Sequence, residues 1–145
     1  MVAVLINPNL VVQRNDRFTT GVVYMPIGLA YVAASLRASG VSITVIDAFG
    51  ECPRRSRIEG KFMVLGLSPS DVVEKIPSDA GAVFVYANQV INHTSLVEII
   101  GAIKKLRPGL AVVVLENTQA VTAYALKPVS QQLLDCGADY LLTGE

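Results

Sequence analysis

Five short apolar runs recur along the chain, and the segments between them carry helical patterns. The runs occupy residues 2–6, 41–46, 82–86, 111–115 and 140–142. Most are rich in β-branched residues and do not alternate with polar ones, which is typical of strands buried on both faces. Strands that alternate with helices predict a parallel sheet with helices on both sides.

The helical segments are recognised by their apolar spacing and their end signals. Leu29, Val32, Ala33 and Leu36 share one face of a first helix, with Pro26 near its start and Gly40 after its end. A second, short helix is expected to begin at a capping box formed by Ser68 and Asp71.

Two further helices follow the third and fourth strands. A capping box formed by Ser95 and Glu98 is expected to open the third helix, which carries a clean apolar face. That face comprises Leu96, Ile99, Ile100, Ile103 and Leu106. The fourth helix is expected to open at Pro128, to turn Val129, Leu133 and Leu134 inward, and to end at Gly137.

Short connections and right-handed crossovers favour one arrangement of these elements. We expect one α/β domain spanning residues 1–145, a doubly wound five-stranded parallel sheet with the flavodoxin-like (Rossmann-like) order 2-1-3-4-5. Residues 7–26 are expected to form a long loop, and residues 50–60 a polar loop. The segment FMVLGL at 62–67 is either a short extra strand or a packed loop.

Charge and composition exclude several classes of function. Basic and acidic residues number 12 each, which disfavours a nucleic-acid partner because such proteins present a basic face. No apolar run approaches the roughly 20 residues of a membrane span, and the first residues lack the features of a signal peptide. Cys52 and Cys136 are far apart and predict neither a disulfide framework nor a metal site. A cytoplasmic location is expected.

In doubly wound sheets, ligands bind outside the carboxyl ends of the strands. Familiar phosphate motifs are absent there: no GxGxxG follows the first strand, and no GxxxxGK[ST] occurs anywhere. A phospho-acceptor receiver domain needs acidic residues after strands one and three, where this chain has Asn7 and Ala87-Asn88. The loop after strand one also lacks the Ser/Thr/Gly-rich character of a flavin phosphate loop.

Four segments resemble one known family in order and spacing. VLINP, PIGLAYVAASLRASGVSITVIDA, GLSPSDVVEKI and GADYLLTGE look like the N-terminal cobalamin-binding domain of cobalamin-dependent radical S-adenosylmethionine enzymes. The resemblance covers nearly the whole chain, and its most specific parts are the first-helix segment and the closing Gly-Glu.

The resemblance implies a function for the chain and for a larger parent. Cobalamin would lie over the carboxyl edge of the sheet, with its nucleotide tail running between strands and helices. No DxHxxG is present, so cobalt would have no protein histidine, as is common among the radical relatives. In the family, a barrel domain with a CxxxCxxC-bound 4Fe-4S cluster and S-adenosylmethionine follows the Gly-Glu. We therefore expect an N-terminal fragment of a methyltransferase-type enzyme, not catalytic alone, whose partner is that barrel.

The candidate cofactor-binding residues lie at the strand ends and at the start of the first helix. They are Asn7, Pro26, Gly28, Leu29, Asp47, Ala87, Asn88, Glu116, Asn117, Thr118, Gly144 and Glu145. Asp47 has two interpretations, a bond to a corrin amide or ribose, or a cap for the next loop. Tyr86 is a candidate to flank a ring, or else a core residue. His93, the single histidine, is interpreted as a surface residue or one near a helix N-terminal cap, rather than as an axial ligand.

One departure from the family leaves an alternative open. Relatives usually have Gly-Gly-Pro-His after the fourth strand, where this chain has Leu115-Glu116-Asn117-Thr118. Glycines let a bulky planar group approach the backbone closely. The alternative is a degenerate domain that binds no cofactor and serves as a structural or interaction module for its catalytic partner.

Overall fold

The main sheet has five parallel strands. The computed structural model describes residues 2–16, 21–118 and 124–144. Its main sheet has the order β3-β1-β6-β7-β8, and every neighbouring pair is parallel. The strands are β1 (Val2–Asn7), β3 (Ser42–Asp47), β6 (Ala80–Ala87), β7 (Ala111–Glu116) and β8 (Tyr140–Leu142). Counted along the chain within this sheet, that order is 2-1-3-4-5, which confirms the predicted flavodoxin-like fold.

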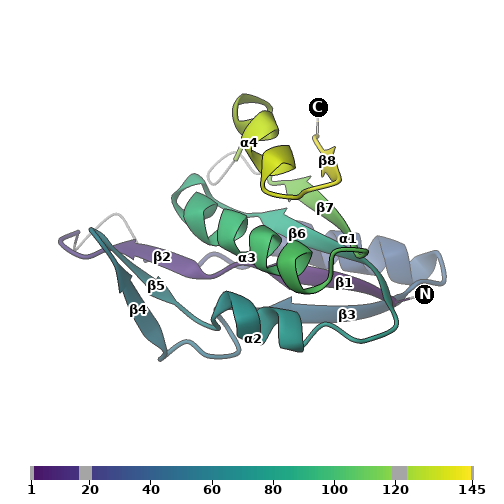
Figure 1. Cartoon of the computed structure of the whole chain (residues 1–145), viewed down its shortest axis with the longest axis horizontal. Coiled ribbons are helices and arrows are strands. Elements are labelled where there is room, and N and C mark those ends of the chain that lie inside the picture. The colour runs from purple at the N-terminus through teal and green to yellow at the C-terminus, as the bar shows by residue number, and fades with distance from the viewer. Residues whose placement is uncertain (1, 17–20, 119–123, 145) are drawn as a thin grey trace.

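Helices cover both faces of this sheet. Figure 1 shows α1 (Ile27–Ala38) behind the sheet and α2 (Pro69–Glu74) and α3 (His93–Leu106) in front of it. The last helix, α4 (Ser130–Asp135), follows the short 3-10 helix η2 (Lys127–Val129), and a second 3-10 helix, η1 (Val90–Asn92), precedes α3. This division follows from right-handed crossovers, since the chain reverses direction across the sheet after β3.

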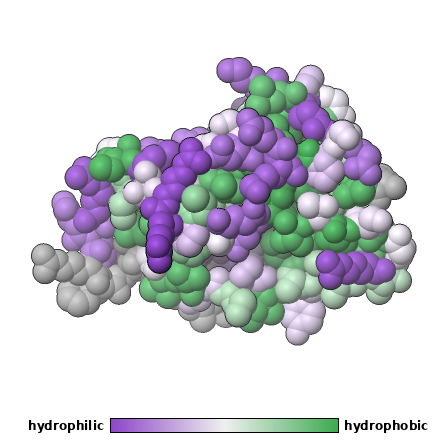
Figure 2. All heavy atoms as spheres, turned by 90° about the horizontal axis from the view of Figure 1, so that it is seen from below, coloured by the Kyte–Doolittle hydropathy of each residue, from purple (hydrophilic) through white to green (hydrophobic). Residues whose placement is uncertain are grey.

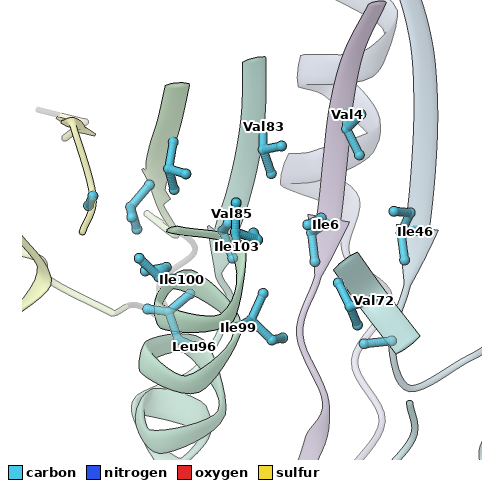
Figure 3. Close-up of a cluster of buried hydrophobic side chains, with 14 of the residues drawn as sticks. Val4, Ile6, Ile46, Val72, Val83, Val85, Leu96, Ile99, Ile100 and Ile103 are labelled. Atoms are coloured by element: carbon cyan, nitrogen blue, oxygen red, sulfur yellow. The ribbon is translucent and has the colours of Figure 1, made fainter. Parts of the chain in front are cut away.

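The larger core lies between the sheet and α3. Figure 3 shows Val4, Ile6, Val83 and Val85 of the strands together with Val72 of α2 and with Leu96, Ile99, Ile100 and Ile103 of α3, all members of one buried cluster. These four α3 residues, predicted as an apolar face, are at most 1% exposed. The fifth predicted member, Leu106, is 54% exposed because it is the last residue of the helix. A smaller core packs α1 on the opposite face.

The helix signals predicted for α1 and α2 are confirmed, but the predicted starts of α3 and α4 are wrong; α4 begins at Ser130, and Pro128 lies in the 3-10 helix η2 before it. Ser68 and Asp71 form the expected capping box of α2, and Gly40 follows α1 with a positive φ of 79°. The box predicted for Ser95 and Glu98 is wrong, because α3 begins earlier, at His93. The Ser95 hydroxyl is fully buried and donates to Asn9 Oδ1 at 2.8 Å instead. Leu134, expected to face inward, is 42% exposed.

A second sheet stands beyond the carboxyl ends of the main strands (Figure 1). It is antiparallel, with the order β2-β5-β4, and comprises β2 (Leu10–Gln13), β5 (Phe62–Leu65) and β4 (Ser56–Glu59). The prediction of a structureless loop over residues 7–26 is therefore wrong for β2, and that of a polar loop at 50–60 is wrong for β4. The strand option at FMVL is confirmed. β2 was missed because its partner β5 lies about fifty residues away, and β4, which forms a hairpin with β5 across residues 60–61, was missed because four mostly polar residues show too short a pattern.

Several large apolar side chains remain exposed around the sheets. Val23, Met25 and Tyr31 are 62%, 77% and 74% exposed. Figure 2 shows that hydrophobic areas on the face seen from below are interrupted by strips of hydrophilic residues. Within the described part of the chain, no helix has both the length and the apolar character that a membrane crossing requires.

An ion pair fixes the last strand to the sheet and carries a pH prediction. Asp139 Oδ2 accepts hydrogen bonds from Lys104 Nζ at 2.6 Å and from the Val112 N–H at 2.7 Å. The bond from Lys104, with that from Val112, lowers the pKa of Asp139 from its usual value of 3.8. A carboxyl whose pKa is lower in the folded state stabilises the fold above its unfolded-state pKa, and this stabilisation is lost as the pH falls through the folded-state pKa.

We expect the free energy of unfolding to fall less between about pH 7 and about pH 3 in Asp139→Asn than in the unaltered protein, because only the latter loses this ionised contact. Urea titrations at the two pH values measure the difference. Identical pH dependence in the two proteins would contradict this role for Asp139.

Candidate functional site

Two neighbouring recesses lie at the carboxyl edge of the main sheet. The first recess, of about 370 Å³, is lined by Asn7, Asp47, Tyr86, Asn88, Asn92 and Asn117, with residues 22–26 along its rim. The second recess, of about 330 Å³, lies between α1 and the ends of β7 and β8 and is lined by Gly28, Val32, Tyr86, Leu115, Glu116 and Gly144. Tyr86 and Asn117 line both recesses, so the two are adjacent.

A chain of side-chain amides crosses the floor of the first recess. Asn7 Nδ2 donates to Asp47 Oδ1 at 3.0 Å, and Asn88 Nδ2 donates to Asn7 Oδ1 at 3.2 Å. Asn92 Nδ2 donates to Asn88 Oδ1 at 2.9 Å, and the Val11 N–H donates to Asn92 Oδ1 at 3.0 Å. Since each amide both donates and accepts, the network fixes the direction of every member and ties three strand ends together.

Asn9, which also lines this recess, joins the second sheet to the main domain. Its side chain is fully buried, and its Nδ2 donates to the Leu65 carbonyl at 3.1 Å and the Leu67 carbonyl at 2.9 Å. Its Oδ1 accepts the Ser95 hydroxyl. All hydrogen-bonding atoms of this amide are thus used in holding β5 and α3 in place.

Glu116 has a comparable structural role beside the second recess. One carboxylate oxygen accepts the Leu126 N–H and the other accepts the Gly144 N–H, both at 2.8 Å. The side chain therefore connects the end of β7 to the chain before η2 and to the chain after β8. Leu115 is 6% exposed and packs in the α1 core.

Tyr86 stands at the boundary of the two recesses and against the start of α1. A Cβ atom added to Gly28 would lie 2.6 Å from the Tyr86 hydroxyl oxygen, so only glycine fits here without a shift of the ring. Burial raises the pKa of Tyr86, which keeps the hydroxyl protonated at neutral pH.

Most of the predicted site residues line one or the other of the two recesses. Asn7, Pro26, Asp47 and Asn88 line the first, Gly28, Glu116, Thr118 and Gly144 line the second, and Asn117 lines both. Leu29 and Ala87 are 3% and 1% exposed, and their side chains lie in the core rather than in a recess. Glu145 lies outside the described residues.

The candidate residues left out by the sequence analysis are mostly ordinary in type. Asn9, Asn92 and Gln89 line the first recess, as does Phe49, while Val32 and Leu142 line the second. Nothing local distinguishes a buried asparagine from one in a turn, so Asn9 and Asn92 had no signal. Asn9 follows the end of β1 by two residues, and Asn92 follows the end of β6 by five. These positions place the two residues near the site only once the fold is known.

The single histidine belongs to a different part of the molecule. His93 opens α3, lines neither recess, and its Nδ1 is hydrogen-bonded to the Tyr124 hydroxyl. Burial raises the pKa of Tyr124 to about 12. Among the described residues, no three His, Cys, Asp or Glu side chains gather closely enough to hold a metal ion.

Comparison with known proteins bears on the fold. The sequence matches no protein-family model and no curated protein. The structure is similar to the GsuK RCK domain, with 17% identity and a TM-score of 0.55 over 97% of this chain and 24% of that one. It is also similar to the response regulator RcsB of Salmonella typhimurium, with 14% identity and a TM-score of 0.51 over 97% of this chain and 51% of that one.

These similarities establish the Rossmann-like α/β fold and no more. The chain spans about a quarter and about half the length of the two matched chains. At such low identity, folds are shared by proteins with unrelated ligands. The function must therefore be argued from the recesses themselves.

Proposed function

We propose that this domain binds cobalamin, with the corrin over the first recess and the nucleotide tail in the second. The observation that carries the proposal is the pairing of an amide-lined recess with a more apolar one at the carboxyl edge of a doubly wound sheet. The order of the four family-like segments in the sequence supports the same ligand.

The chemistry of the first recess suits the rim of a corrin ring. That rim carries primary amides, which both donate and accept hydrogen bonds, as the asparagines here do. Asn7, Asn88 and Asn92 are already oriented by one another, so a ligand would meet fixed amides rather than freely rotating ones. Asp47 adds an acceptor, because its Oδ1 accepts from the Asn7 amide and the Gly50 N–H, while its Oδ2 accepts no hydrogen bond from the described residues.

The second recess suits a flat aromatic base. Val32, Leu115 and Leu142 supply apolar wall, and the ring of Tyr86, which packs against Gly28, forms its edge toward the first recess. A recess of about 330 Å³ lies within the size range of small-molecule sites. The corrin brings four nitrogen ligands for its cobalt, so the site needs no metal-binding cluster of its own.

When bound, cobalamin would supply a cobalt-carried methyl group. This chain's residues would hold the corrin amides, keep the tail away from cobalt and leave the outer face of the ring open. We propose that a radical barrel domain with a 4Fe-4S cluster and S-adenosylmethionine acts at that face, as a cytoplasmic methyltransferase. The catalytic residues would then lie in that partner domain and not in this one.

Two neighbouring positions on α1 provide a matched test. Val32→Trp is expected to fill the second recess and weaken methylcobalamin binding by more than about tenfold, because the tail would lose its space. Tyr31→Trp is the control, since Tyr31 is 74% exposed and lines neither recess. Calorimetric titration of both variants, with circular dichroism to verify folding, measures the effect. Equal affinities would contradict the placement of the tail.

A specific observation favours the alternative of a degenerate, non-binding module. Leu115 and Glu116, which stand where relatives have glycines, are both committed to the fold, Leu115 in the core and Glu116 in two backbone hydrogen bonds. In that alternative the second recess is a packing surface for the catalytic domain. A finding that the unaltered domain binds no corrinoid at all would support this alternative.

A further inference from the structure

We propose that the first turn of α1 and the hydroxyl of Tyr86 form a site for a phosphodiester group, at the boundary between the two recesses. Within the proposed function this group is the phosphodiester of the cobalamin tail, and to that extent the inference rests on it. The site itself is argued from the backbone of α1 and from Tyr86, without reference to the corrin.

The N-terminus of α1 has unused hydrogen-bond donors. Its N-cap residue is Pro26, which makes no side-chain cap, and the first turn contains no acidic residue. The Ile27 N–H donates to the Met25 carbonyl and the Ala30 N–H to the Pro26 carbonyl. Between them, the N–H groups of Gly28 and Leu29 have no acceptor among the described residues. A 12-residue helix with free N–H groups at its start attracts anions through those groups and through its dipole.

Tyr86 provides an independent indication of a ligand at the same place. The residue is 3% exposed, yet its hydroxyl has no hydrogen-bond partner among the described residues. Among the described residues, every fully buried side-chain oxygen or nitrogen has a hydrogen-bond partner. Because the Tyr86 hydroxyl has none, its oxygen must be in contact with solvent. Its oxygen is the atom nearest to the position of a Cβ on Gly28, which directs it at the first turn of α1.

Protonation makes this hydroxyl a donor. Burial raises the pKa of Tyr86 above its usual value of 10.0, so the phenol carries its proton over the whole physiological range. A protonated phenol beside two backbone N–H groups gives three neutral donors for one group of oxygens. The absence of a side chain on Gly28 lets the Tyr86 hydroxyl lie close to the backbone of this turn, so that the three donors face one small region.

Charge distinguishes a diester from a monoester. The charged residues that line the two recesses, within the described chain, are Asp47 and Glu116, and no lysine or arginine lines either one. A phosphate monoester carries close to two negative charges at neutral pH and would be repelled by these carboxylates. A phosphodiester carries one, which neutral donors and a helix dipole can balance. The site therefore favours a linkage such as the one that joins the parts of a nucleotide tail.

The test compares two corrinoids that differ in this group. Cobalamin contains the phosphodiester, and cobinamide, which lacks the nucleotide tail, does not. Tyr86→Phe removes the hydroxyl and no intramolecular hydrogen bond, so the variant is expected to fold. Tyr31→Phe, on the exposed side of α1, is the matched control.

We expect Tyr86→Phe to weaken cobalamin binding by about tenfold or more, as loss of a hydrogen bond to a charged group does, and to leave cobinamide affinity within about twofold. Tyr31→Phe should change neither. Equal weakening of both corrinoids, or of neither, would overturn the phosphodiester site while leaving cobalamin binding intact.

A second arm tests the site without any corrinoid. Dimethyl phosphate, titrated to concentrations on the order of 100 mM at constant ionic strength, is expected to shift the amide resonances of Gly28 and Leu29 in the unaltered protein and not in Tyr86→Phe. If the domain binds no corrinoid but shows these shifts, the proposed function fails and the phosphodiester site stands. If those two resonances do not move, the phosphodiester site is wrong.

Discussion

Replacement of Asn9 by alanine is expected to lower the free energy of unfolding by about 3 kcal/mol. The change removes three hydrogen bonds from a fully buried side chain, those to the carbonyls of Leu65 and Leu67 and that from the Ser95 hydroxyl. The partners stay buried with their bonding capacity unmet, and the desolvation of such groups costs about 1–3 kcal/mol each. Urea titration followed by circular dichroism measures the loss.

Asn15 offers the matched control. It is exposed and belongs to the same part of the chain, and Asn15→Ala is expected to change stability by less than about 0.5 kcal/mol. If Asn9→Ala were no more damaging than Asn15→Ala, the account of Asn9 as the connection between the two sheets would be wrong.

Replacement of Gly66 by alanine is expected to destabilise the domain by several kcal/mol, roughly 3 or more. Gly66 has a φ of +121°, in a region that L residues rarely adopt, and an added Cβ would lie 2.1 Å from the Ala48 carbonyl oxygen. That carbonyl also accepts the Leu67 N–H at 2.7 Å, so it cannot move without breaking the connection between β5 and the end of β3.

A second glycine separates the effect of space from that of backbone conformation. Gly60 has a φ of +57° and nothing within 4 Å of its Cβ position, so Gly60→Ala should cost only about 1 kcal/mol. Thermal unfolding of the two variants makes the comparison. Similar losses would show that the close approach at Ala48 does not limit Gly66.

The main sheet could be predicted because its signals are local and repeated. Strands such as the one at residues 111–115 are continuous apolar runs, and α3 carries four core residues at helical spacing, Leu96, Ile99, Ile100 and Ile103. Each signal depends on neighbours a few residues away. Together with right-handed crossovers they leave one strand order, which the structure confirms.

The second sheet and the amide network could not be predicted in the same way. β2 pairs with β5 across about fifty residues, and a four-residue strand has too few positions to display a period. The bonds of Asn9 and Asn92 join elements more than fifty residues apart. Asparagine is common in turns and loops, so residue type alone indicates a turn, and only the fold reveals burial.

Tyr86 is an intermediate case, because its position could be predicted from the sequence but its contacts could not. The sequence places it at a strand end near the carboxyl edge, but not its contact with Gly28. That contact depends on how closely α1 approaches β6, which follows from the packing of Leu29 and Ala33 in the smaller core. The position of a candidate residue could therefore be predicted, while its hydrogen-bonding state could not.

The measurement that tests the central claim most directly is the visible spectrum of cobalamin in the presence of the domain. Cobalamin absorbs differently when its own base is bound to cobalt and when that base is held elsewhere. We expect a stoichiometric change to the base-off spectrum, with a dissociation constant on the order of micromolar, because the tail would be held in the second recess. An unchanged spectrum with cobalamin and protein each at hundreds of micromolar, on the order of a hundred times that constant, would contradict cobalamin binding by this domain.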